Sequence, residues 1–142
     1  MTSDAKKYEL SNYRIIQAEE SIDEAEFLLS GGKSPRSIIN RAYYAMFYAV
    51  LALLVHESYA TSKHTGILAY FNKKFIKEGL LSESLGLAIN KAFDLRQRGD
   101  YREYVELTHA QASHFIGEAK IFVSTVNDYL ASRRKPETTI DS

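Results

Sequence analysis

The apolar positions along the chain follow the pattern of amphipathic α-helices, because they recur at spacings of three and four residues. Near the N-terminus, for example, Ile15, Ala18, Ile22 and Ala25 fall on one helical face. No segment shows the alternation of apolar and polar residues that is typical of a β-strand. The spacing predicts five helices, over residues 11–30, 35–58, 63–79, 83–98 and 104–132.

Small residues mark the boundary between the first two helices. Gly31 and Gly32 end the first helix, since glycine readily adopts the backbone conformation of a helix C-terminus. Ser34 and Pro35 begin the second. The serine oxygen can accept a hydrogen bond from a free amide, and the proline ring presets the helical backbone.

The second predicted helix is apolar on most of its sides. A stripe of small residues lets a neighbouring backbone approach closely, and a stripe of large residues fills the space on the other side. The stripes consist of Ala42, Ala45, Ala49 and Ala52, and of Tyr43, Phe47, Leu51 and Leu54. We therefore expect this helix at the centre of an all-α bundle.

The last predicted helix carries two apolar stripes and therefore needs two neighbours. One neighbour is expected to be the second helix. The other could be a second copy of the chain, since an apolar strip left exposed is a natural dimer surface. The stripes consist of Ala112, Ile116, Ala119, Val123, Val126 and Leu130, and of Phe115, Phe122 and Tyr129.

Length and composition indicate one compact helical domain. The chain has 142 residues, of which 45% are hydrophobic and 25% charged. We predict a domain over residues 11–132 and a disordered tail over residues 133–142. With 18 basic and 18 acidic residues the net charge is zero, so contact with nucleic acid would have to be local.

Three features favour a cytoplasmic protein that does not enter a membrane. The chain has no cysteine, so disulfides are excluded. No signal peptide is visible at its start. The longest apolar stretch, residues 42–55, is shorter than the roughly 20 residues that a membrane span needs.

Three arginines, Arg96, Arg98 and Arg102, stand in an expected break between the last two helices, and His109 follows. Guanidinium groups bind phosphate, and histidine transfers protons near neutral pH. If the last helix begins by Arg102, two helical turns place Arg102 and His109 on one face. The histidine could then act on the 2′-hydroxyl or the leaving oxygen of RNA while the arginine stabilises phosphate charge, without a metal. The competing interpretation is a solvated, salt-bridged turn.

Other kinds of site are not indicated. The histidines are scattered, and no metal-binding, phosphate-loop or serine-nucleophile motif is present, so we predict neither a metal nor a cofactor. For His64, at an expected helix start, a capping or packing role is favoured over catalysis.

Three motifs in order along the chain resemble those of small stand-alone members of the HEPN domain family. The match covers about residues 11 to 132. The motifs read NRAYYA from position 40, SKHTGI from position 62 and RQRGDY from position 96.

The resemblance implies an up-and-down bundle of four to five helices, often a homodimer, and frequently encoded beside a minimal nucleotidyltransferase as a toxin–antitoxin pair. Active members are metal-independent endoribonucleases, with an arginine followed after four to six residues by a histidine. Arg102 and His109 fit this signature as catalytic residues. Arg96, Arg98 and Arg41 are the candidates for binding RNA phosphate or nucleotide, although Arg41 could instead pair with Asp100.

The sequence leaves three functions open. The first is a HEPN ribonuclease or toxin that uses Arg102 and His109. The second is a non-catalytic module that binds a nucleotide or a nucleotidyltransferase partner. The third is a structural helical homodimer whose basic segment is neutralised by its own carboxylates. Some relatives carry a tyrosine two residues after the histidine, which the partner enzyme modifies, but Gln111 occupies that position here.

Overall fold

The computed structural model describes residues 2–101 and 107–133, with side chains from 4 to 97 and from 107 to 133. It confirms the predicted all-α bundle. The helices are α1 (Thr2–Ser30), α2 (Pro35–Leu54), α3 (His64–Phe71), the π-helical segment η1 (Asn72–Lys77), α4 (Glu83–Tyr101) and α5 (His109–Arg133).

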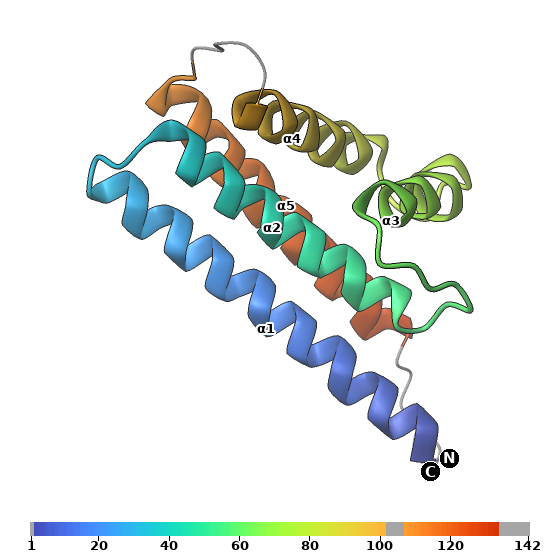
Figure 1. Cartoon of the computed structure of the whole chain (residues 1–142). Helices are drawn as coiled ribbons and strands as arrows, with labels where there is room; N and C mark the ends of the chain where they lie inside the picture. The colour runs from blue at the N-terminus through green and yellow to red at the C-terminus, as the bar shows by residue number, and fades with distance from the viewer. Residues whose placement is uncertain (1, 102–106, 134–142) are drawn as a thin grey trace.

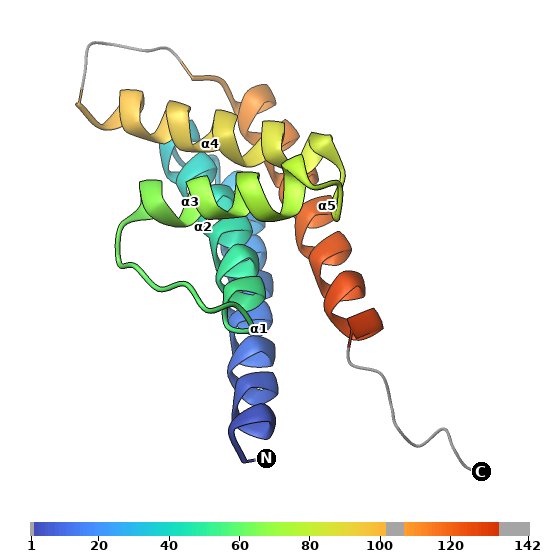
Figure 2. The ribbon, with the colours of Figure 1, turned by 90° about the vertical axis from the view of Figure 1, so that its right-hand side faces the viewer.

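The long helices α1, α2 and α5 lie side by side, and α3 and α4 lie across them (Figures 1 and 2). Helix α2 contacts α1, α3, α4 and α5, which confirms its predicted central place. Twelve of its side chains are buried. Because α2 reaches each of the other four α-helices, side chains from distant parts of the sequence can meet along it.

The predicted signals between α1 and α2 act as expected. Gly32 has a φ of 66°, and the amides of Gly32 and Lys33 donate to the carbonyls of Leu29 and Leu28, so the turn closes the end of α1. The Ser34 hydroxyl accepts a hydrogen bond from the Ser37 amide at 3.2 Å. This short connection fixes the direction of the Lys33 backbone.

Removing the Ser34 cap is expected to destabilise the protein. Ser34→Ala should lower the free energy of unfolding by about 1 kcal/mol, because the Ser37 amide loses its acceptor. Urea denaturation followed by circular dichroism measures this change. Ser124→Ala, on the exposed side of α5, is the matched control and should change it by about 0.5 kcal/mol at most. Equal effects of the two substitutions would contradict the cap.

Several predicted boundaries were wrong. Helix α1 begins at Thr2 rather than near residue 11, and α2 ends at Leu54 rather than near residue 58. Helix α4 continues through Gly99 to Tyr101, because a single glycine weakens a helix without necessarily ending it. Apart from Arg133, which ends α5, the predicted tail lies outside the described residues.

The start of α5 is the correction that bears most on function. The helix begins at His109, not near residue 104, and residues 107 and 108 are not helical. The Thr108 hydroxyl accepts from the Gln111 amide at 3.1 Å, and the Gln111 side-chain oxygen accepts from the Thr108 amide at 2.8 Å. This reciprocal pair is a capping box, which fixes a helix start.

One described helix, α2, is long and apolar enough to cross a membrane by length and composition alone. However, 67% of its apolar window is buried inside the bundle. A core helix of this kind passes the same test, so the finding is weak evidence for a membrane span.

Candidate functional site

The structure brings the three motif segments together around Arg96 of α4. The Arg96 side chain is half-buried. Its Nε donates to the Asn40 side-chain oxygen at 3.0 Å, and its Nη2 donates to the Tyr44 hydroxyl at 3.1 Å. The centre of the guanidinium also lies 5.2 Å from the ring centroids of both Tyr43 and Tyr44. Helix α2 therefore holds the guanidinium group in one orientation.

The imidazole of His64 completes this cluster from the first position of α3. Its Nδ1 lies 2.9 Å from the hydroxyl of Tyr43, and its ring stacks on Phe47 with centroids 4.0 Å apart. Burial, followed by the positive charge of Arg96, lowers the pKa of His64 below its usual value. Burial raises the pKa of Tyr43, so its hydroxyl stays protonated. Both rings are therefore neutral at pH 7.

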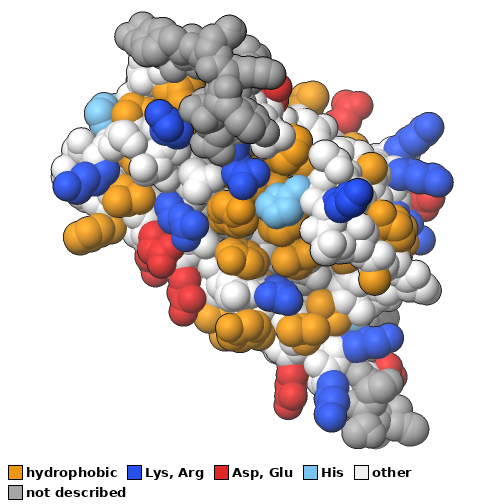
Figure 3. All heavy atoms as spheres, in the orientation of Figure 1, with side chains coloured by type: hydrophobic (Ala, Val, Ile, Leu, Met, Phe, Trp, Pro, Cys, Tyr) orange, Lys and Arg blue, Asp and Glu red, His pale blue; other side chains and the backbone are white. Residues whose placement is uncertain are grey.

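We call this group the Arg96 cluster; it consists of Asn40, Tyr43, Tyr44, Phe47, His64 and Arg96. Among the side chains that the structure describes, no Asp or Glu forms a hydrogen bond or ion pair with any of the six. On the face seen in Figure 3, Lys and Arg side chains surround an area of hydrophobic side chains with a histidine among them. The cluster thus combines a cation with polar and aromatic groups.

The side chain of Arg41 lies beside the cluster and pairs with an acidic residue of α1. Its Nη1 lies 2.8 Å from a carboxylate oxygen of Glu24 in α1. The centre of its guanidinium is 5.5 Å from the Tyr44 ring centroid. The alternative pairing of Arg41 with Asp100 falls on a side chain that lies outside the described part of the chain. Glu24 would therefore compete with a ligand for the Arg41 guanidinium.

The side chain of His109 is exposed at the first position of α5. Its Nε2 lies 2.8 Å from the backbone carbonyl oxygen of Lys33, in the connection between α1 and α2. A carbonyl oxygen can only accept a hydrogen bond, so Nε2 carries the hydrogen. In the neutral ring, Nδ1 is then the basic nitrogen. This arrangement suits a group that accepts a proton.

Of the residues predicted to bind or react, three have described side chains: Arg41, Arg96 and His109. The first two flank Tyr44, whereas His109 contacts the α1–α2 connection. Arg102 lies outside the described residues. The Arg98 backbone belongs to α4, but its side chain is not described. Because residues 107 and 108 are not helical, helical spacing cannot place Arg102 and His109 on one face.

Sequence reasoning missed Asn40, Tyr44 and His64 as members of a common site. The packing role expected of His64 is present in its stacking on Phe47. The sequence did hold a signal for these residues, since Asn40, Tyr44, His64 and Arg96 all lie within the three motifs that resemble the HEPN family. Motif order does not show which side chains meet, and the bond from Arg96 to Asn40 spans 56 positions.

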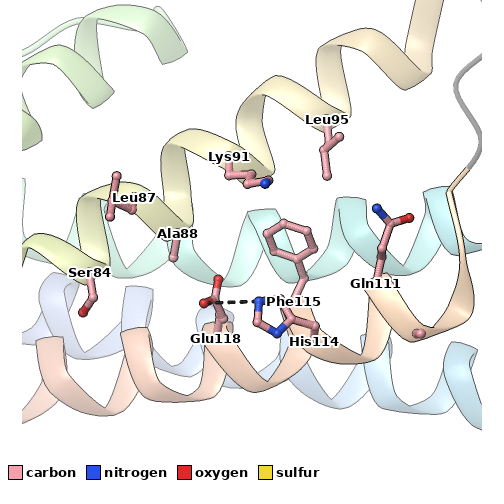
Figure 4. Close-up of a pocket in the computed structure, with 10 residues that line it drawn as sticks. Ser84, Leu87, Ala88, Lys91, Leu95, Gln111, His114, Phe115 and Glu118 are labelled. Atoms are coloured by element: carbon pink, nitrogen blue, oxygen red, sulfur yellow. Dashed lines mark ion pairs between the residues drawn. The ribbon is translucent and has the colours of Figure 1, made fainter.

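A separate groove of about 680 Å³ runs between α4 and α5 (Figure 4). Ala88, Leu95 and Phe115 give it an apolar lining, while His114 lies 3.4 Å from Glu118 on its α5 side. Neither Arg96 nor His109 is among the residues that line it. Within the described ranges, no three His, Asp or Glu side chains gather as metal ligands would.

Comparison with known proteins identifies the fold family. The HEPN domain matches residues 11–129. A UPF0332 protein of Thermotoga maritima is 35% identical over 130 residues, covering 92% of this chain and 98% of that protein. Two proteins of Methanocaldococcus jannaschii, named "Putative toxin MJ0142" and "Putative toxin MJ0605", are each 34% identical to this chain. The match with the first covers 84% of this chain and 80% of that protein. The match with the second covers 80% of this chain and 83% of that protein. The chain therefore belongs to the HEPN domain family.

Proposed function

We propose that this HEPN protein is the toxin-like component of a pair with a nucleotidyltransferase and that it cleaves RNA without a metal, in the cytoplasm and as a homodimer. The names of two relatives, both putative toxins, support the toxin-like role. The observation that carries the proposal of cleavage is the placement of His109. This imidazole is exposed at a helix start, with one nitrogen held by a backbone carbonyl and the other left to act as a base.

In this mechanism Nδ1 of His109 takes the proton of an RNA 2′-hydroxyl. The 2′-oxygen then forms a bond to phosphorus, and the bond from phosphorus to the 5′-oxygen breaks. The leaving 5′-oxygen takes up a proton from solvent water, His109 releases the proton it accepted to solvent, and the products are a 2′,3′-cyclic phosphate and a 5′-hydroxyl end. Arg102 would stabilise the negative charge that develops on the phosphate oxygens.

Arg96, Arg98 and Arg41 are proposed to hold RNA phosphates away from the bond that breaks. Of these, Arg96 is best suited, because its described partners are uncharged. Arg41 is less available, since its guanidinium is paired with Glu24. Direct binding through a few arginines fits a chain of zero net charge, in which no long-range field attracts RNA.

Cleavage of end-labelled RNA in EDTA tests this function. The purified chain is expected to cleave, Arg102→Ala and His109→Ala are expected to leave the RNA intact, and Arg133→Ala, at the far end of α5, should cleave like the parent. Folding of each protein is checked by circular dichroism. A folded parent chain that leaves RNA intact, or equal activity of the Arg102 and Arg133 variants, would contradict the proposal.

A second function, binding without cleavage, is favoured by the Arg96 cluster. The cluster can attract an anion, yet it is built from α2, α3 and α4 and does not include His109. A nucleotide-binding HEPN module would use the cluster and would not need a base. It would bind nucleotide or RNA and leave the RNA intact in the same assay.

A further inference from the structure

We infer that two copies of this chain associate through the outward side of α1, with the two helices antiparallel and Tyr13 of each copy at the two-fold axis. The residues concerned are Lys6, Leu10, Tyr13, Ile16 and Glu20, and we call them the α1 face. The inference gives the proposed homodimer a surface, and it rests on the proposed function in that respect alone. It requires neither RNA binding nor cleavage.

The α1 face carries a row of exposed apolar side chains. Leu10, Tyr13 and Ile16 are 42%, 53% and 50% exposed. They stand three residues apart, so they lie along one side of the helix. The opposite side of α1, which includes Ile15 and Ala18, is buried where α1 packs against α2 and α5. Helix α1 lies at the edge of the bundle (Figure 1), so this apolar row is open to a partner.

The last helix, whose second stripe could have faced a second copy, uses that stripe inside the chain. The ring centroid of Phe122 lies 5.6 Å from that of Phe71 in α3. The ring centroid of Tyr129 lies 5.9 Å from that of Phe75 in η1. Phe115 is only 3% exposed. The apolar row of α1 is therefore a better dimer surface than the aromatic stripe of α5.

The charges at the two ends of the α1 face indicate that the partner is a second copy. Lys6 stands seven residues before Tyr13 and Glu20 seven residues after it, which is nearly two helical turns in each direction. In an antiparallel pair centred on Tyr13, Lys6 of each copy meets Glu20 of the other. Leu10 of each copy meets Ile16 of the other in the same way. A parallel pair would instead bring each charge to its own copy, and like charges repel.

The neighbouring charged residues fit the same antiparallel arrangement. Glu19 of one copy lies opposite Lys7 of the other, and Glu9 lies opposite the uncharged Gln17. Two-fold symmetry repeats every such pair, so the surface is complementary to itself. The overlap covers residues 2–24, about 34 Å of helix at 1.5 Å per residue. Among the described side chains, none forms an ion pair with the lysines or with Glu19, so these charges are available to the second copy.

Disulfide cross-linking tests the position of the axis, because the chain has no cysteine of its own. Facing Cα atoms of two packed helices come within about 6 Å of each other, a distance that a disulfide can span. Tyr13→Cys should therefore form a covalent dimer in air at micromolar concentration, seen on a non-reducing gel. Ile121→Cys is the matched control on α5, where the native side chain is 63% exposed. It should cross-link at least tenfold more slowly.

Charge reversal tests the antiparallel arrangement. Lys6→Glu and Glu20→Lys should each raise the dissociation constant of the dimer tenfold or more, because symmetry places like charges together twice. The double variant should return it to within about threefold of the parent, since opposite charges meet again. Lys73→Glu, an exposed reversal on η1, should leave it unchanged. Analytical ultracentrifugation at low salt measures these constants, since salt screens exposed charges, and circular dichroism checks the fold.

Two results would overturn the inference while leaving a homodimer in place: equal cross-linking of the two cysteine variants, or an unchanged dissociation constant in both folded single reversals. A parent chain that stays monomeric at high micromolar concentration would overturn this inference and the proposed homodimer together. If the chain dimerises through the α1 face but leaves RNA intact, the proposed cleavage fails and this inference stands.

Discussion

Replacing His109 with alanine is expected to lower the rate constant for RNA cleavage by about 10²–10⁴-fold, the range that a positioned acid or base contributes. The hydrogen bond from Nε2 to the Lys33 carbonyl oxygen fixes the ring and leaves Nδ1 to accept a proton. Alanine removes the base while keeping α5, because the Thr108 and Gln111 cap does not involve the imidazole. Single-turnover cleavage in EDTA measures the rate constant directly.

Two controls make this result specific. His114→Ala removes another exposed imidazole from α5, one that lies beside Glu118, and should leave the rate within about twofold of the parent. Lys33→Ala should behave in the same way, since the contact with His109 uses the backbone carbonyl and not the Lys33 side chain. A rate that falls equally in the His109 and His114 variants would exclude a special role for His109.

The largest loss of stability is expected from Phe122→Ala in α5. Phe122 is 1% exposed, and its ring centroid lies 5.6 Å from that of Phe71 in α3, so it joins the long helices to the elements that cross them. Removing a buried phenylalanine costs about 3–5 kcal/mol through lost transfer energy and the cavity that remains. Urea denaturation followed by circular dichroism should show a correspondingly lower free energy of unfolding.

The adjacent residue supplies the control. Ile121 is 63% exposed, so Ile121→Ala should change the free energy of unfolding by about 0.5 kcal/mol or less. The two substitutions stand side by side on one helix and differ mainly in burial. Similar losses for both would show that the core is not arranged around Phe122 as described.

The helices were largely predictable because their signals are local. Apolar spacing reveals a helix, and Ser34 and Gly32 reveal where helices begin and end. The start of α5 was also recoverable, since Thr108 and Gln111 have the spacing of a capping box. The π-helical turn at Asn72 was not predicted; its side-chain amide donates to the Leu68 carbonyl at 2.9 Å, a contact that periodicity does not reveal.

The candidate site was only partly predictable because its contacts are not local. Arg96 was recognised as a phosphate-binding candidate from its residue type, but its bonds to Asn40 and Tyr44 join α4 to α2. Arg41, for which a pairing with Asp100 was one alternative, reaches Glu24 of α1, and the Asp100 side chain lies outside the described part. Charge can be counted from a sequence, whereas the choice among several carboxylates depends on how the helices pack.

The contact between His109 and Lys33 limits how the connection between α1 and α2 can vary in length. The acceptor is the backbone oxygen of Lys33, so other side chains at this position would keep the contact. One extra residue between Gly32 and Ser34, however, would move the carbonyl away from the imidazole. In the proposed mechanism, an insertion in this surface turn would impair the base even though every reacting side chain remained in the sequence. Deletions and insertions, rather than point substitutions, are therefore the changes that this turn should tolerate least.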